Sequence, residues 1–127
     1  EASSLSGILL NDLYYDFVMA NRIEIEGVQV VTPVGLMVLK AIAWLDLTKK
    51  KTEGDIHAYS KDISKHKNDI ARLSVLTAGV EPFVPEGIRT VMMEFMSLYR
   101  EEAIDTTALR LPIGENDVKE EIRRLFL

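Results

Sequence analysis

The chain has 127 residues, of which 47% are apolar, so it is long and hydrophobic enough to bury one core and is not a disordered chain. Lys and Arg number 15 against 20 Asp and Glu, a net charge of −5, so we do not expect a protein that coats nucleic acid. Cysteine is absent, which excludes disulfides, thiolate zinc sites and cysteine nucleophiles. No apolar run reaches the roughly 18 residues of a membrane span, and we expect no membrane partner. The chain starts at Glu1 rather than at methionine, so we expect a fragment or a processed product.

The N-terminal segment is predicted to mix helix and strand. Residues 5–10 form a short apolar run that fits either a buried strand or a turn of helix. Asn11 and Asp12 follow as candidate caps for a helix that reaches Ala20. Its inward face is expected to carry Leu13, Phe17 and Ala20.

The best strand signal of the chain lies at residues 23–31. Its aliphatic residues are β-branched, and Glu24 and Glu26 alternate with them at the start. This alternation predicts one strand with one polar face.

Helices are predicted for most of the remaining chain. The first, 33–48, has Thr32 as its cap and is apolar nearly all round, which indicates burial on most faces; a basic loop over 49–59 follows it. The second is expected to begin with Ser60 as its cap and to end at Gly79. The third covers 86–103, and residues 105–114 are expected to be irregular. A capping pair of Asp117 and Glu120 predicts a short last helix with Val118, Ile122 and Leu125 on its inward face.

The predicted fold class is therefore α+β and mostly helical, with a small β element packed on a bundle of about four helices. We expect two parts, 1–32 with the β element and 33–127 as one compact helical unit.

Lys40 lies in the middle of the most apolar predicted helix. A buried ammonium is costly unless a carboxylate or several acceptors meet it. In one interpretation the side chain reaches water or pairs with a neighbouring carboxylate. In the other, it points into a cleft and binds phosphate or another anion.

The second predicted helix directs polar groups inward. With about 100° per residue, His66 falls in the middle of the apolar face, and Asp62 and Asp69 fall at its edges. Lys61, Lys65 and Arg72 fall on the solvent side. Three interpretations stay open: a structural network in which an aspartate fixes His66 and neutralises Lys40, a metal site, and an anion or nucleotide site.

Three strings resemble bacterial nucleotidyltransferase-like proteins of the group that includes abortive-infection toxins of toxin–antitoxin systems. They are SSLSGILLNDLYYDF, EIEGVQVVTPVGLMVLKAIAWLDLTKKK and SKDISKHKNDIARL, and the similarity covers roughly residues 2–76. The most specific piece is KDISKHKNDIARL. The last fifty residues match only as a generic helical tail.

The resemblance implies transfer of a nucleoside monophosphate from a nucleoside triphosphate to an acceptor, with Mg²⁺ as the metal. It implies that Lys40, Lys65 and His66 bind the nucleotide and that Asp62 and Asp69 are catalytic. The family's D-x-D strand, which carries the metal, does not occur in this sequence. The only related carboxylate pair includes Glu24, which we treat as a candidate metal ligand.

The leading hypothesis is therefore the C-terminal portion of such an enzyme, inactive by itself, with residues 1–32 as a remnant of its sheet. It implies a bacterial, cytoplasmic protein. The alternative is a non-catalytic interaction module whose apolar helices, notably 86–103, contact a second copy or an antitoxin-like partner.

Overall fold

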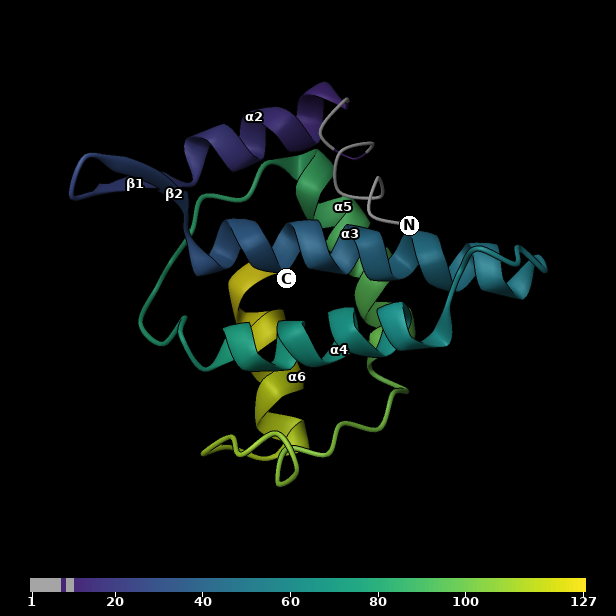
Figure 1. The fold of residues 1–127 in the computed structure, drawn as a ribbon. Helices are drawn as coiled ribbons and strands as arrows, with labels where there is room; N and C mark the ends of the chain where they lie inside the picture. The colour runs from purple at the N-terminus through teal and green to yellow at the C-terminus, as the bar shows by residue number, and fades with distance from the viewer. Residues whose placement is uncertain (1–7, 9–10) are drawn as a thin grey trace.

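The computed structural model describes Ile8 and residues 11–127 (Figure 1). The elements are α2 (Asp12–Ala20), β1 (Arg22–Ile25), β2 (Val28–Val31), α3 (Pro33–Thr52), α4 (Ser60–Ser74), α5 (Glu86–Tyr99) and α6 (Glu115–Phe126). The predicted mostly helical α+β fold is confirmed. Apart from Ile8, which is helical, the predicted strand or turn at 5–10 lies outside the described residues.

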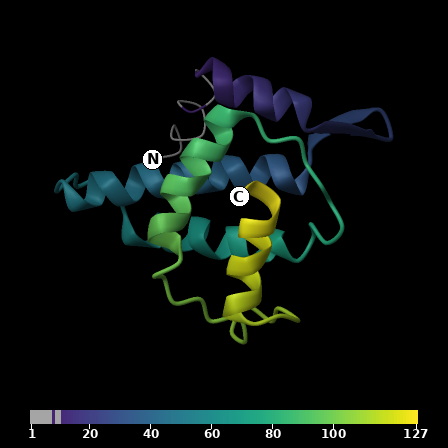
Figure 2. The same ribbon diagram turned by 180° about the vertical axis from the view of Figure 1, so that it is seen from behind.

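The helices form two crossed layers. α3 and α4 lie side by side with opposite directions, and α5 and α6 cross them on one face, as Figures 1 and 2 show from opposite sides. Trp44 of α3 lies at the centre, where its ring makes edge contacts with Phe95 and Tyr99 of α5 at centroid distances of 5.5 and 5.7 Å. The buried residues of α5 that face this core are Ile88, Met92, Phe95, Met96 and Tyr99.

α3 is the central helix because it is apolar on nearly every face. Thr32 caps it by accepting a hydrogen bond from the Gly35 amide at 3.3 Å, and Pro33 occupies its first turn. The predicted end at residue 48 is wrong. The helix continues through the three lysines to Thr52, and their positive charges favour the C-terminal end of a helix.

A β-hairpin replaces the single strand predicted at 23–31. Glu26 and Gly27 have φ angles of 51° and 82° and turn the chain between β1 and β2. Two consecutive positive φ values are typical of the tight turn that joins two antiparallel strands. Arg22 pairs with Val31 and Ile25 with Val28 at the two ends of the ladder.

α2 is confirmed, with the Asn11 side chain accepting a hydrogen bond from the Leu13 amide at 2.9 Å. The predicted inward face is only partly correct. Phe17 and Val18 are buried, whereas Leu13 and Ala20 are exposed. Tyr14, one turn before Phe17 and Val18, is partly buried and also packs against the core.

Three further helix boundaries differ from the prediction. α4 ends at Ser74 and not at Gly79, and α5 ends at Tyr99 rather than at 103. α6 begins one turn before the predicted start, because the Asp117 carboxylate accepts a hydrogen bond from the Gly114 amide at 3.0 Å. The irregular segment predicted at 105–114 is confirmed.

Among the described residues, no helix has both the length and the apolar character needed to cross a bilayer.

Candidate functional site

Asp69 binds three cationic side chains at the interface between α3 and α4. Its Oδ2 accepts hydrogen bonds from Lys40 Nζ at 3.0 Å and from Lys65 Nζ at 3.1 Å, and its Oδ1 accepts one from Arg72 Nη1 at 3.0 Å. Lys65 and Arg72 reach it along α4 at helical spacings of four and three residues, whereas Lys40 reaches it from α3. The carboxylate partner expected for Lys40 therefore exists, and it is Asp69.

The cluster carries more positive than negative charge, because three cations face one carboxylate. Burial acts to raise the pKa of Asp69, but hydrogen bonds from Lys40 and Lys65, together with their charges, hold that pKa below its usual value. Asp69 is therefore ionised at neutral pH. Only 17% of the Lys40 side chain and 21% of the Asp69 side chain are exposed, so the pair lies at the surface edge of the helix interface.

His66 lies beside this cluster as a neutral imidazole. Burial lowers its pKa, and the charges of Lys40 and Lys65 lower it further, while Asp69 and Asp62 oppose them. Its Nδ1 atom is buried and has no hydrogen-bond partner in the described part of the chain. The predicted network in which an aspartate holds His66 is therefore not formed at Nδ1.

The other predicted site residues differ in their surroundings. Asp62 is half-buried in the first turn of α4 and makes no ion pair with the described residues, although its charge acts on His66. Glu24 lies on the exposed hairpin, where its Oε1 accepts a hydrogen bond from Gln29 at 3.3 Å. The structure thus brings Lys40, Lys65, His66 and Asp69 together and leaves Glu24 on a separate element.

The donor set does not fit a magnesium ion. Both oxygens of Asp69 already accept hydrogen bonds from cationic side chains. Across Ile8 and residues 11–127, no group of three or more His, Asp or Glu side chains is placed to hold a metal. Mg²⁺ coordination by Glu24 stays a prediction.

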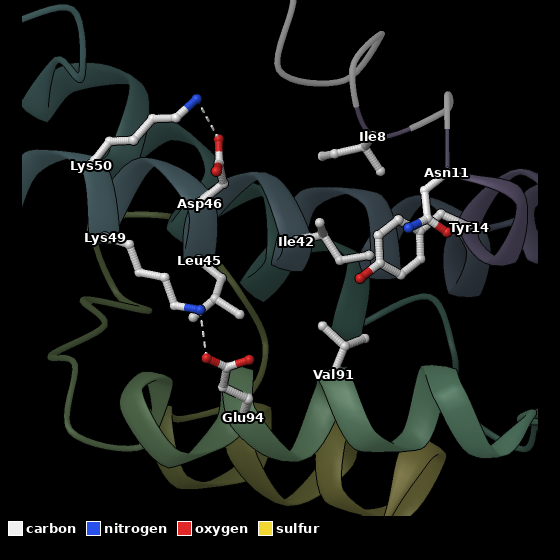
Figure 3. Close-up of a pocket in the computed structure, with 10 residues that line it drawn as sticks. All are labelled: Ile8, Asn11, Tyr14, Ile42, Leu45, Asp46, Lys49, Lys50, Val91 and Glu94. Atoms are coloured by element: carbon white, nitrogen blue, oxygen red, sulfur yellow. Dashed lines mark ion pairs between the residues drawn. The ribbon is translucent and has the colours of Figure 1, made fainter. Parts of the chain in front are cut away.

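A separate cavity of about 520 Å³ lies between α2, α3 and α5 (Figure 3). Its walls combine an apolar part with charged pairs and two polar side chains, namely Ile8, Ile42, Leu45, Val91, Asp46, Lys49, Lys50, Glu94, Asn11 and Tyr14. Lys49 Nζ contacts Glu94 Oε2 at 2.6 Å, and Lys50 Nζ contacts Asp46 Oδ2 at 3.0 Å. The cavity does not include Lys40, so it is not the nucleotide-binding cleft that the resemblance implies at Lys40.

Sequence reasoning missed this cavity because its lining comes from three helices that are far apart in the chain. The lysines of residues 49–51 were expected in a solvated loop, but α3 carries them and Lys49 pairs with α5. A helical spacing of four between Asp46 and Lys50 was the one local signal for their ion pair.

No protein-family model, no curated protein and no solved structure matches this chain. The α3–α4 cluster can hold an anion, because its lysines and arginine have donors left over. An ammonium carries three N–H donors and a guanidinium five, and Asp69 uses one from each side chain.

Proposed function

We propose that this chain is the helical portion of a nucleotidyltransferase-like protein, in which the α3–α4 cluster contacts the phosphates of a nucleoside triphosphate. The observation that carries the proposal is the convergence of Lys40, Lys65 and Arg72 on one carboxylate. The resemblance of KDISKHKNDIARL to the family's pattern supports the same assignment.

The geometry gives each residue a distinct role in this proposal. Asp69 acts as a positioning residue, because it holds the lysines from two helices at 3.0 and 3.1 Å from one oxygen. Lys40 and Lys65 then direct their remaining donors to phosphate oxygens. Arg72 adds a planar donor set that suits a phosphate.

Asp69 is poorly suited to be a general base. A carboxylate whose pKa is lowered by its cationic neighbours binds a proton weakly, and its lone pairs are already engaged. If either predicted catalytic aspartate contacts the acceptor, the structure favours Asp62, which has no ion pair within the described residues. His66 is neutral at pH 7 and therefore adds no positive charge to the cluster.

The test is titration of ATP and of the other triphosphates, followed by the fluorescence of Trp44, which lies one turn after Lys40 in α3. Lys40→Ala should weaken binding by about tenfold or more, which corresponds to about 1.4 kcal/mol. Lys61→Ala is the matched control, because Lys61 is an exposed lysine of α4 outside the cluster. Equal affinity in the Lys40 and Lys61 variants would refute the role of Lys40.

Magnesium provides a second comparison. No group of three or more His, Asp or Glu side chains in the described part of the chain is placed to hold a metal, so we expect that binding through the cluster does not require Mg²⁺. Because Mg²⁺ neutralises part of the phosphate charge, it should weaken this contact. A strict requirement for Mg²⁺ would contradict phosphate binding by the cluster alone. We also propose the bacterial cytoplasm as location, on the resemblance alone.

A different observation favours the second candidate function, an interaction module. One face of α5 is buried within the chain, and Met93 and Leu98 are the large apolar side chains that this helix exposes. The hairpin also exposes aliphatic side chains that no described element covers, with Ile25 51% and Val28 60% exposed. Light scattering during size-exclusion chromatography distinguishes self-association from the need for another protein.

A further inference from the structure

The β-hairpin has one face that is entirely aliphatic. Ile23 stands opposite Val30 and Ile25 opposite Val28, so these four side chains share a face because side chains alternate along a strand. Ile23, Ile25 and Val28 are 47%, 51% and 60% exposed. A soluble hairpin normally covers such a face, because two strands alone are only marginally stable in water.

The hairpin also projects from the helical body. Figures 1 and 2 show it extending beyond the junction of α2 and α3, with the helices on one side only. β1 pairs only with β2 among the described residues, so its outer edge is unpaired. In an antiparallel ladder, hydrogen-bonded pairs alternate with non-hydrogen-bonded pairs. Ile25 and Val28 flank the two-residue turn as a hydrogen-bonded pair, so Glu24 belongs to a non-hydrogen-bonded pair. The N–H and C=O groups of Glu24 therefore point to this outer edge.

The negative charge around the hairpin favours a positively charged partner. Residues 11–31, which comprise α2 and the hairpin, contain one arginine and four carboxylates, a net charge of −3. Glu24 lies on the hairpin face opposite the aliphatic one, and Glu26 lies in the turn. Arg22 is directed back to the helix, because its Nε donates a hydrogen bond to the Met19 carbonyl at 3.0 Å.

We propose that the outer edge of β1 binds an extended segment of another protein in which aliphatic residues alternate with Lys or Arg. Such a segment adds a third strand through its main chain. Its aliphatic side chains continue the face of Ile23 and Ile25, and its basic side chains contact Glu24. A second copy of this chain is a poorer occupant, because pairing two hairpins brings their carboxylates together.

The partner surface is independent of the phosphate proposal. It uses β1 and the turn, whereas the cluster lies between α3 and α4. Lys40→Ala should therefore leave strand binding unchanged, so the two proposals fail separately.

The probe is a short peptide of alternating valine and lysine, added to the full chain. We expect chemical-shift changes at the backbone amides of residues 22–25 and saturable binding by fluorescence anisotropy. A valine–glutamate peptide tests the charge, and a glycine–lysine peptide tests the aliphatic face. Each control peptide should bind about tenfold more weakly or worse. Equal binding of either one, or no binding of the valine–lysine peptide, overturns the proposal.

Matched variants locate the contact. Ile25→Thr keeps a β-branched residue but removes aliphatic surface, and it should weaken binding of the valine–lysine peptide several-fold. Ile56→Thr is the control, because Ile56 is 81% exposed but lies outside the hairpin, and it should have no effect. Glu24→Lys lies on the polar face, so the hairpin should still form, and the preference should shift to the valine–glutamate peptide. The proposal is refuted by an unchanged preference, or by a dimer that Ile25→Thr dissociates.

Discussion

Lys119 is predicted to be the most important charged residue for stability. Only 6% of the residue is exposed, although lysine is among the residues least often buried. Its Nζ donates hydrogen bonds to the carbonyls of Arg100 and Glu102, at 2.9 and 2.8 Å, and to Glu115 Oε2 at 2.8 Å. The ammonium thus satisfies carbonyls just after α5 with a side chain of α6.

The substitution Lys119→Met removes these donors and keeps a side chain of similar length. A hydrogen bond to a charged group contributes about 1.5–3 kcal/mol, so three would suggest more than 4 kcal/mol. Glu115 is partly exposed, with 41% of its side chain accessible, so water replaces part of that contact. We therefore expect the free energy of unfolding to fall by about 3 kcal/mol, a large part of the 5–15 kcal/mol typical of a domain.

Urea denaturation followed by Trp44 fluorescence measures this loss, with Lys61→Met as the control for an exposed lysine. The control should change the free energy of unfolding by less than about 0.5 kcal/mol. A loss below about 1 kcal/mol in Lys119→Met would show that the carbonyls find other partners, and it would refute the reasoning.

Two further predictions concern His66 and Gly35. In the unfolded chain, His66 binds a proton near its ordinary pKa of about 6.5, but in the folded chain its pKa is lower. The free energy of unfolding should therefore fall as the pH is lowered from about 7.5 to about 5.5. His66→Leu should be tolerated and should reduce this dependence in denaturation curves at both pH values; an unchanged dependence would contradict the assignment to His66. Gly35→Ala should lower stability by about 1–3 kcal/mol in the same assay, because its Cβ would lie 2.6 Å from Val31 Cγ1 and 3.0 Å from Asn21 Cβ. The three atoms nearest to a Cβ at Gly87 all belong to Leu13, the first at 2.7 Å, and this flexible side chain can shift, so Gly87→Ala should cost less. An equal loss would show that Gly35 is not specially confined.

Much of the helical structure follows from local sequence. Thr32 and Pro33 mark the start of α3, and Asn11 marks the start of α2, because capping depends only on neighbouring residues. The orientation of α4 was also predictable. Its periodicity places Ile70 inside and Lys65 outside, as the structure has them.

Sequence reasoning failed where the decisive contact is distant or geometric. The turn at Glu26 and Gly27 was hidden inside a run of β-branched residues, which has the same pattern in one strand as in two. α5 ends at Tyr99, before the predicted end at residue 103. Just beyond this end, the carbonyl of Arg100 accepts a hydrogen bond from Lys119, which lies nineteen residues further along the chain. Local propensity contains no information on such a contact.

The sequence by itself determined that this protein is a mostly helical domain with α3 at its centre, because apolar periodicity and caps are local properties. Only the tertiary structure decided which charges meet. Lys40 and Asp69 are 29 residues apart, and they pair because α3 and α4 lie against each other. The aliphatic face of the hairpin is likewise a tertiary property, since it stays exposed only because no other described element covers it.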